Sequence, residues 1–326
     1  MAEKNQFLSV RGITVEYTQG KNIVHAVNDV SFDLEKGKTL GLVGETGAGK
    51  TTIAKTILRI LPVPPARFKG GEVWLDGKNL TALSEEEMRK VRGNQIAMIF
   101  QDPMTALNPL MTVGDQIVEV LQIHNPHMKM EEAVGRTKEL LEMVGIVGER
   151  YKEYPHQFSG GMKQRVVIAM ALACSPDLIL ADEPTTALDV TIQAQVLDLI
   201  KELQTKQNTS MILITHDLGV VAETCDTVAV VYAGEVVEYA SKEDLFRHTK
   251  HPYTKGLFNS IPSLTGDETR LTPIPGLPPD PTHLPEGCRF AKRCPYATKG
   301  CFHMEVPMKE VAPGHYCRCL RETEEG

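Results

Sequence analysis

Residues 44–51 read Gly44-Glu45-Thr46-Gly47-Ala48-Gly49-Lys50-Thr51 and match the pattern G-x-x-x-x-G-K-[ST]. They lie between an apolar segment, residues 39–43, and a segment from 51 to 60 that we expect to be helical. Glycines allow several backbone N–H groups to converge on phosphate oxygens, and the first turn of a helix attracts an anion. Lys50 supplies a cation for the β- and γ-phosphates of a nucleotide, and the Thr51 hydroxyl is a ligand for Mg²⁺. The sequence therefore predicts a strand, a phosphate loop and a helix that bind a nucleotide.

The segments around this loop predict an α/β fold. Short apolar runs alternate with helical segments, which is typical of parallel βαβ units. Two segments near the N-terminus alternate in polarity instead, as half-buried strands do. Between about 102 and 165 apolar residues recur at helical spacing without a convincing strand, so we expect a helical insertion. The expected strands are residues 7–16, 27–34, 39–43, 71–75, 95–100, 178–181, 211–215 and 228–231, and the expected helices include 51–60 and 191–207.

The composition limits the class of protein. The chain has 326 residues, 42% hydrophobic and 24% charged, so we expect one large globular domain with an appendage. A net charge of −7 disfavours nucleic acid as a partner, because phosphate backbones reward a concentrated basic surface. No apolar run approaches the roughly 20 residues that span a bilayer, and residues 1–6 do not resemble a signal peptide. We therefore expect a cytosolic protein that reaches a membrane only through a partner.

Two further apolar segments end in polar residues. Residues 178–181 are followed by Asp182 and Glu183, and residues 212–215 by His216. Nucleotides bind at the carboxyl ends of parallel strands in α/β sheets. Asp182 suits the shell of Mg²⁺, and Glu183 suits the orientation or deprotonation of the attacking water. A neutral His216 is able to hydrogen-bond the γ-phosphate, although each of these residues taken separately has an ordinary structural explanation.

Residues 158–162, Phe158-Ser159-Gly160-Gly161-Met162, precede a helical stretch and form a second candidate anion site. They resemble the signature loop of ABC ATPases, usually written LSGGQ. In that family the signature loop of one subunit covers the γ-phosphate held by its partner's phosphate loop, so that two subunits enclose two nucleotides. Phe158 and Met162 depart from the usual leucine and glutamine, and methionine at this position is similar to the peptide-permease branch. Alone, the loop is equally compatible with a glycine-rich helix start.

The same resemblance assigns roles to other positions. Tyr17 matches the aromatic residue that stacks on adenine, and Gln101 matches the glutamine that reaches Mg²⁺ and the attacking water. Ala187-Leu188-Asp189 matches a loop that crosses the dimer interface. The resemblance spans residues 7–239 and implies a RecA-like P-loop NTPase core with an N-terminal antiparallel β subdomain. It implies catalysis by Lys50, Gln101, Glu183 and His216, Mg²⁺ ligation by Thr51, Gln101 and Asp182, and ATP binding by Tyr17, Gly44, Glu45, Thr46, Gly47, Ala48, Gly49, Lys50, Thr51, Thr52, Gln101, Asp182, Ser159, Gly160 and Gly161.

A second part of the chain begins near residue 248. We expect residues 1–247 to form the nucleotide-binding domain and residues 248–326 a small irregular extension, because the latter is rich in proline. The segment His251-Pro252-Tyr253-Thr254, followed by PIPGLPPDP, resembles the tail of the dipeptide, oligopeptide and nickel importer ATPases.

The extension also contains the pattern Cys288-x5-Cys294-Pro-x5-Cys301-x15-Cys317. It belongs to the same tail, and the resemblance implies a [4Fe–4S] cluster on these four cysteines. A segment without its own hydrophobic core can be held together by a metal instead, and the spacing is looser than the CxxC pairs typical of zinc. Zinc and unligated thiols stay as alternatives, and Cys319 is a possible substitute for Cys317. We expect a structural role for this group.

Together these features imply an ATP-hydrolysing subunit that powers import of dipeptides or oligopeptides from the cytoplasmic face of a cell membrane. The implied partners are two membrane-spanning permease subunits, a second ABC ATPase, which we expect to be a paralogue, and indirectly an extracytoplasmic peptide-binding protein. A nickel importer ATPase of the same family is the alternative. A soluble ABC ATPase acting on nucleic acid or ribosomes is disfavoured, since the chain has one cassette and a short insertion, and the intact catalytic residues disfavour a non-hydrolysing subunit.

Overall fold

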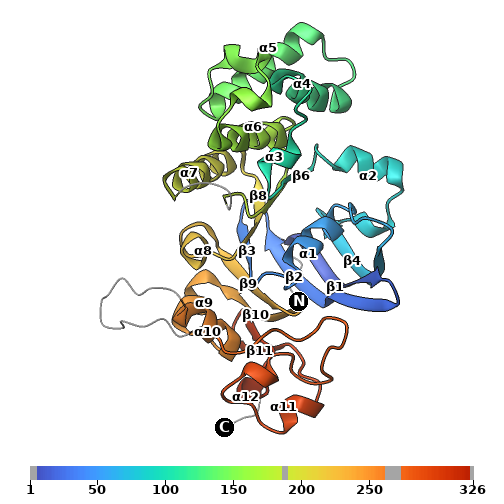
Figure 1. Ribbon diagram of the computed structural model, residues 1–326, viewed down its shortest axis with the longest axis vertical. Coiled ribbons are helices and arrows are strands. Elements are labelled where there is room, and N and C mark those ends of the chain that lie inside the picture. The colour runs from blue at the N-terminus through green and yellow to red at the C-terminus, as the bar shows by residue number, and fades with distance from the viewer. Residues whose placement is uncertain (1–5, 186–189, 261–272, 324–326) are drawn as a thin grey trace. The chain divides into compact units, whose positions relative to one another are not determined.

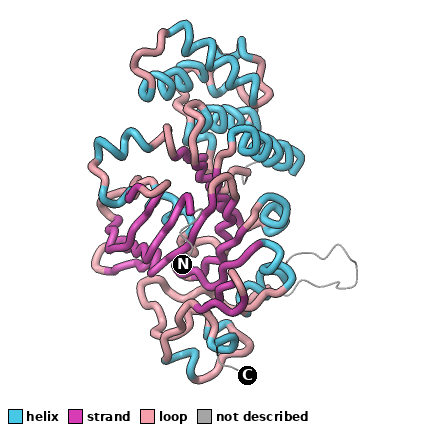
Figure 2. Tube along the Cα trace, turned by 180° about the vertical axis from the view of Figure 1, so that it is seen from behind, coloured by secondary structure: helices cyan, strands magenta, loops and turns pink. Residues whose placement is uncertain are grey.

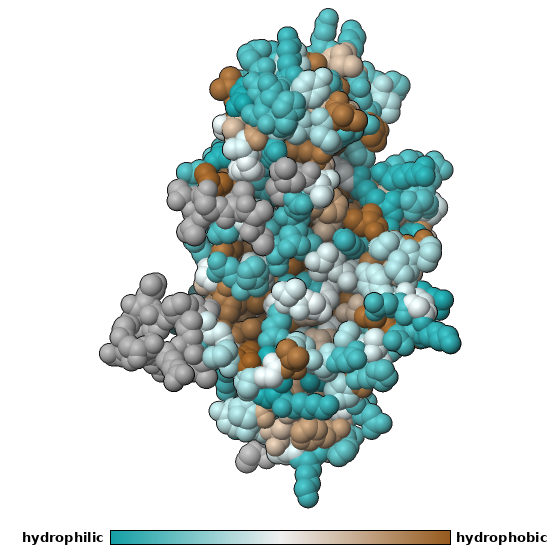
Figure 3. Space-filling view, in the orientation of Figure 1, coloured by the Kyte–Doolittle hydropathy of each residue, from teal (hydrophilic) through white to brown (hydrophobic). Residues whose placement is uncertain are grey.

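The computed structural model describes residues 6–185, 190–260 and 273–323, and the chain forms two compact units. The first unit is made of residues 1–35, 39–81 and 214–326, and the second of residues 36–38 and 82–213. Figure 1 labels their elements, and Figure 2 shows the same chain from behind with the strands in magenta. Polar residues cover most of the face drawn in Figure 3, with apolar residues in scattered groups between them. No helix in the described ranges is long and apolar enough to cross a bilayer.

An antiparallel sheet opens the first unit. Its strands are β1 (Gln6–Gln19), β2 (Asn22–Glu35), β4 (Ala66–Leu75) and β5 (Lys78–Asn79), in the order β2-β1-β4-β5, and the 3₁₀ turn η1 (Leu80–Ala82) follows. β1 pairs with both β2 and β4 in antiparallel register. Alternate side chains face the core, as the pleat of a strand requires, and Val10, Val30 and Val73 are fully buried. The predicted antiparallel β subdomain is confirmed.

The phosphate loop belongs to a second sheet of the first unit. β3 (Thr39–Val43) leads into the loop and α1 (Lys50–Ile57) follows it. β3 pairs in parallel with β9 (Thr227–Tyr232), and β10 (Glu235–Ser241) returns antiparallel to β9. Every residue of β3 is buried, as expected for a strand covered on both faces. The accompanying helices are α8 (Leu218–Thr224), α9 (Lys242–Arg247) and α10 (Pro252–Asn259).

The second unit combines a short sheet with a run of helices. Its strands lie in the order β8-β7-β6, with bounds Ser210–Thr215 for β8, Leu178–Asp182 for β7 and Ile96–Ile99 for β6, and β6 pairs in parallel with β7. Only helices and loops occur between β6 and β7, where apolar residues recur at helical spacing. The helices are α2 (Glu85–Val91), α3 (Pro103–Ala106), α4 (Val113–His124), α5 (Met130–Met143), η2 (Gly148–Lys152), η3 (Pro155–Gln157), α6 (Gly160–Leu172) and α7 (Val190–Gln207).

The C-terminal extension is more regular than the sequence indicated. β11 (Lys309–Ala312) and β12 (His315–Cys317) form an antiparallel pair, and β12 adds to the edge of β10. Three short turns complete it: η4 (Ala291–Arg293), α11 (Gly300–His303) and α12 (Leu320–Thr323). Most of the described extension is irregular as expected, but β11 and β12 were not predicted, because strands this short with mixed polarity leave no periodic signal next to a proline-rich segment. The extension, red in Figure 1, thus continues a sheet of the first unit.

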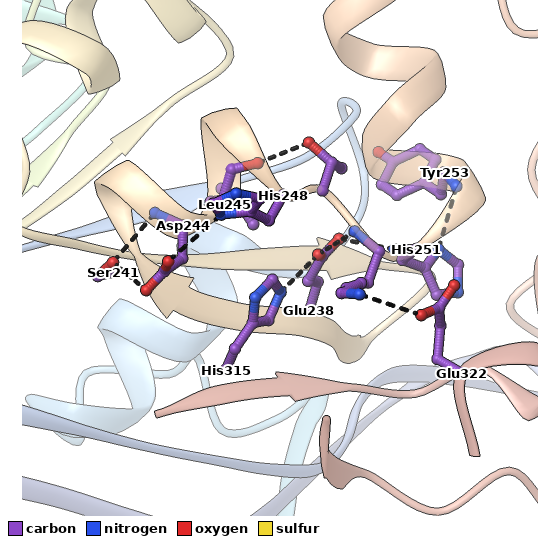
Figure 4. Close-up of polar contacts among 11 residues, drawn as sticks. Glu238, Ser241, Asp244, Leu245, His248, His251, Tyr253, His315 and Glu322 are labelled. Carbon is purple, nitrogen blue, oxygen red and sulfur yellow. Dashed lines mark hydrogen bonds and ion pairs between the residues drawn. The ribbon is translucent and has the colours of Figure 1, made fainter. Parts of the chain in front are cut away.

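A buried carboxylate on β10 fixes the extension to the core (Figure 4). Glu238 has no exposed surface, and it accepts hydrogen bonds from the backbone N–H groups of Lys250 and His251 at 2.7 and 3.0 Å. Nε2 of His315, from β12, lies 2.8 Å from the same carboxylate. Buried carboxylates need such partners, since an unpaired charge is costly in the interior. Glu238 therefore joins β10, the start of α10 and the extension.

His251 connects this carboxylate to the next helix. Its Nδ1 accepts the N–H of Tyr253 at 3.1 Å and so caps the first turn of α10. Burial lowers the pKa of His251 to about 4, against the opposing effect of Glu238. The ring is therefore neutral at physiological pH, with Nδ1 free of a proton as the cap requires.

Replacement of His251 by asparagine should weaken the acid sensitivity of the fold. Because the folded-state pKa of about 4 lies below the unfolded value of 6.5, the unfolded chain takes up the proton first, and stability falls as the pH drops through this window. The wild-type chain should lose about 3 kcal/mol more unfolding free energy than the variant. Asparagine also caps helices but does not titrate. Denaturant titrations between pH 7 and 4 check this, and equal losses in both proteins would contradict it.

Candidate functional site

The phosphate loop takes a path that only glycine allows at two points. Gly49 has a φ of +105°, and a Cβ at this position would lie 2.5 Å from the carbonyl oxygen of Ala26. A Cβ on Gly44 would collide with the carbonyl oxygen of Val231. Side chains cannot approach a backbone this closely. The loop is therefore packed against β2 at one end and against the end of β9 at the other.

Lys50 lies inside the curve of the loop. Its side chain is buried, and Nζ donates hydrogen bonds to the carbonyl oxygens of Gly44 at 2.7 Å and Glu45 at 3.1 Å. The N–H of Ala48 also donates to the carbonyl of Glu45, at 3.1 Å. A buried ammonium group at the start of a helix suits the capture of phosphate, because the dipole and the cation act in the same direction.

The first turn of α1 lies next to Tyr17. Thr51 and Thr52 are half-buried there, and the hydroxyl of Tyr17 lies 3.3 Å from Oγ1 of Thr52. Gly49 is the N-cap of the helix and makes no side-chain capping hydrogen bond. The structure thus brings Tyr17, predicted for adenine stacking, to the same loop as the predicted phosphate ligands.

In the second unit, the end of β7 carries the two predicted acids. Asp182 is buried as the last residue of the strand, and Glu183 follows with a φ of +45°. Residues other than glycine rarely adopt this conformation, and such strain concentrates at functional sites. Nε2 of Gln101, just beyond β6, donates to Oε2 of Glu183 at 2.8 Å. The parallel pairing of β6 with β7 therefore brings the predicted glutamine and the predicted base together.

His216 follows β8 and is exposed. The next residue, Asp217, caps α8 by accepting the N–H groups of Gly219 and Val220 at 2.8 and 3.3 Å. His216 therefore stands at a strand end, as the sequence predicted, and α8, which was not predicted, begins two residues later. Residues 187–189, predicted to cross a dimer interface, lie outside the described residues.

The predicted signature loop forms the start of α6. Oγ of Ser159 accepts the N–H of Met162 at 3.4 Å, and Ser159 and Gly160 are exposed. A Cβ on Gly161 would lie 2.7 Å from Cγ2 of Ile192, so this glycine permits close packing. The loop therefore presents a serine and a glycine at a helix N-terminus on the surface of the second unit.

Comparison with known proteins identifies the family. Residues 27–186 match the family described as "ABC transporter", and residues 237–301 match the family described as "Oligopeptide/dipeptide transporter, C-terminal region". The chain is 52% identical over 321 residues to the oligopeptide transport ATP-binding protein OppD of Bacillus subtilis, covering 98% of this chain and 89% of that protein. It is 54% identical over 322 residues to the dipeptide transport ATP-binding protein DppD of the same organism, with coverages of 97% and 95%.

The chain belongs to the ABC transporter ATP-binding subunits of the oligopeptide/dipeptide family. A solved dimeric structure of the ATP-binding cassette MJ0796 in a post-hydrolysis state, bound to ADP and Pi, is similar with a TM-score of 0.65 and 29% identity. It covers 72% of this chain and 98% of the other. The ABC ATPase fold is thereby confirmed, and ATP hydrolysis is the activity of this subunit.

Phe158 and Met162, the two residues of the signature loop that differ from LSGGQ, contact the same arginine. The guanidinium of Arg150 lies 4.5 Å from the ring centroid of Phe158, and its Nη1 lies 3.6 Å from Sδ of Met162. Arg150 is also paired with Glu153 at 2.7 Å. Cations over rings and sulfur contacts are favourable, so Phe158 and Met162 form a matched set with Arg150. Sequence reasoning missed Arg150 because it lies outside the loop.

The cysteines of the ABC subunit are arranged differently from the prediction. Burial, together with the neighbouring thiols of Cys301, Cys319 and Cys294, raises the pKa of Cys288 to about 11. The N–H of Cys288 also donates to the carbonyl of Cys301 at 2.8 Å. Cys317 is fully buried in β12, opposite Glu238. Cys319 is therefore among the thiols near Cys288, and the predicted ligation by Cys317 stays a prediction.

The predicted metal site is not present as such. Over residues 6–185, 190–260 and 273–323, no three His, Cys, Asp or Glu side chains converge in a way that could hold a metal ion. Burial raises the pKa of the Cys288, Cys294 and Cys319 thiols. Metal ligation requires thiolates, so loading would have to release these protons.

Two side chains that sequence reasoning did not place at the site contact Glu45 of the phosphate loop. The hydroxyl of Tyr253 accepts the N–H of Glu45 at 2.9 Å, and the guanidinium of Arg293 is paired with the Glu45 carboxylate. Tyr253 belongs to the His251-Pro252-Tyr253 segment, which was noted only as a mark of the subfamily. Arg293 gave no signal, because it is one of several cations in a segment of irregular sequence.

Proposed function

We propose that the chain powers the import of dipeptides and oligopeptides through a membrane permease. Similarity over the full length carries this proposal, because relatives named as oligopeptide and dipeptide transport ATP-binding proteins align with 97–98% of the chain. The C-terminal extension, which matches the oligopeptide/dipeptide transporter region, supports the peptide branch.

The proposed assembly places the chain at the cytoplasmic face of the membrane as a peripheral subunit. Two membrane-spanning permease subunits and a second, paralogous ATP-binding subunit are its direct partners, and an extracytoplasmic peptide-binding protein delivers the cargo. The exposure of Ser159 and Gly160 at the start of α6 supports a paired arrangement. These groups, with Gly161, are available to a nucleotide held by the phosphate loop of the partner subunit.

In the proposed reaction, Lys50 exchanges the carbonyl oxygens of Gly44 and Glu45 for the phosphates of ATP, and Tyr17 stacks on the adenine. Thr51, Gln101 and Asp182 are the proposed Mg²⁺ ligands, and hydroxyl, amide and carboxylate oxygens are the donors that this ion prefers. Bound Mg²⁺ neutralises phosphate charge.

Glu183 is the proposed base that accepts a proton from the attacking water. Its carboxylate is held by the amide of Gln101, 2.8 Å away. His216 is proposed to hydrogen-bond the γ-phosphate. A positioned base and a stabilised phosphate are the two contributions that phosphoryl transfer to water requires from a protein.

We further propose that the extension binds an iron–sulfur cluster, or zinc, through Cys288, Cys294, Cys301 and Cys319. The effect of Cys301, Cys319 and Cys294 on the Cys288 thiol, and of Cys294 on the Cys319 thiol, supports the proposal. No step of ATP hydrolysis is assigned to this group.

The variant Glu183→Gln should bind ATP and hydrolyse it about 10² to 10⁴ times more slowly, because an amide does not accept the proton of water. Phosphate release and ATP affinity are measured separately. Glu202→Gln is the matched control, since Glu202 is an exposed acid on α7 paired with Lys206, and it should turn over at the wild-type rate. Wild-type turnover in Glu183→Gln would exclude Glu183 as the base.

Transport is tested in vesicles containing the chain, its permease subunits and its partner ATP-binding subunit. Labelled dipeptide should accumulate only with MgATP and binding protein, and Lys50→Ala should abolish accumulation, because the phosphate loop then lacks its cation. Accumulation of Ni²⁺ in place of peptide would move the chain to the nickel branch.

Metal binding is tested by anaerobic purification with iron, sulfide and zinc analysis and an absorbance spectrum. We expect about four irons per chain and broad absorbance near 400 nm, lost in Cys319→Ser and kept in Cys317→Ser. The reverse pattern would restore Cys317 as the ligand. One zinc per chain would select the alternative, and a metal-free chain would contradict the proposal.

A further inference from the structure

Glu45, within the phosphate loop, is held by an arginine from the C-terminal extension. Arg293 donates through Nη1 to Oε2 of Glu45 at 2.8 Å and through Nη2 to Oε1 at 2.9 Å. The side chain of Arg293 is 6% exposed and that of Glu45 27%. A two-pronged pair of this kind fixes both the place and the orientation of the carboxylate. The two residues are separated by most of the chain, so folding of the extension is what brings them together.

The extension also fixes the arginine itself. Nε of Arg293 donates to the carbonyl of Pro275 at 2.9 Å, and Nη2 lies 3.4 Å from the carbonyl of Ile274. Nη1 lies 3.3 Å from the hydroxyl of Tyr232. The guanidinium carbon lies 5.7 and 5.9 Å from the ring centroids of Tyr232 and Phe290. An arginine with this many partners is preorganised, so it can hold Glu45 without further loss of side-chain entropy.

Glu45 also contacts Lys50, the predicted catalytic lysine, so fixing Glu45 helps to fix Lys50. The N–H of Glu45 donates to the hydroxyl of Tyr253 at 2.9 Å. Its carbonyl accepts Nζ of Lys50 at 3.1 Å and the N–H of Ala48 at 3.1 Å. The backbone and side chain of one loop residue are thus held by Tyr253 and Arg293 on one side, while Lys50 rests on it from the other.

A second residue of the extension, Arg289, supports the phosphate loop through the turn between β9 and β10. Arg289 donates to the carbonyl of Ala233 and is paired with Glu235 at 2.8 Å. The intervening residue, Gly234, donates its N–H to the carbonyl of Ala48 at 2.9 Å. The turn between β9 and β10 therefore transmits the position of the extension to the middle of the phosphate loop.

Charge gives Arg293 a second role. A carboxylate in a loop that binds phosphates repels the triphosphate unless a cation neutralises it, since like charges a few ångströms apart interact strongly when partly buried. Arg293 supplies that cation without occupying the phosphate site, because both of its terminal nitrogens are directed at Glu45.

We propose that Arg293 is a positioning residue for ATP binding. It neutralises Glu45 and fixes the phosphate loop, so the ATP affinity of the ABC core depends on the folded C-terminal extension. The inference concerns the loop and does not depend on which substrate is transported.

The experiment compares the ATP affinity and the turnover of folded full-length variants. Arg293→Gln should weaken MgATP binding about tenfold, because it leaves the Glu45 carboxylate unpaired beside the phosphates. Turnover at saturating ATP should stay near wild type. Combining Arg293→Gln with Glu45→Gln should restore most of the affinity, since the two amides are neutral and able to hydrogen-bond each other. Arg293→Lys, which keeps the charge but loses the fork, should fall between wild type and Arg293→Gln.

The neighbouring exposed Lys292 provides the control, because Lys292→Gln removes the same charge from the same turn and should leave ATP affinity unchanged. Thermal unfolding of each variant separates affinity from stability. A folded Arg293→Gln with wild-type ATP affinity would overturn the proposal and leave the pair as a structural anchor. A double variant as weak as Arg293→Gln would also overturn it, because neutralisation of Glu45 would then have no effect.

Discussion

The path of the phosphate loop is set by contact with backbone on both sides, and most of the first unit is arranged around this contact. Gly49 packs on the carbonyl of Ala26 in β2, and Gly44 packs on the end of β9. The carbonyl of Ala48 accepts the N–H of Gly234, whose own carbonyl accepts the N–H of Asn28 at 2.8 Å. A loop fixed in this way holds its N–H groups ready for an anion, so binding of phosphate costs little reorganisation.

The C-terminal extension also helps to fix the phosphate loop. It adds β12 to the edge of β10, where the Glu238 carboxylate joins His315 to the segment before α10. That segment delivers Tyr253 to the N–H of Glu45, while η4 delivers Arg293 to its carboxylate. Elements that follow the ATPase core in sequence thus contribute contacts to its nucleotide loop. The segment similar to the C-terminal region of oligopeptide/dipeptide transporters begins at residue 237 and includes Tyr253 and Arg293, which contact Glu45 of the phosphate loop.

The sequence predicted the parts of the fold that depend on local patterns. The buried strand 39–43, the glycine-rich loop and the acids after residue 181 each have a strong periodic or compositional signal, and the structure places them at strand ends. It did not predict β11, β12 or Arg293, because short mixed strands and a single arginine have no local signature. The burial of Cys317 opposite Glu238 also depends on the register of β12 against β10, which has no local signature. Likewise, the pairing of Arg150 with Phe158 and Met162 is visible only once helices η2 and α6 are packed.

Hydrogen–deuterium exchange of the full-length chain with and without MgATP tests the central claim, that ATP is held by a phosphate loop supported from the extension. The account predicts that ATP slows exchange most strongly in peptides covering residues 44–52, and also in those covering Tyr253 and Arg293, because these residues contact Glu45. Unchanged exchange in residues 44–52 at saturating ATP would contradict the assignment of the site. Protection of the loop without any change around Tyr253 and Arg293 would contradict the coupling of the extension to it.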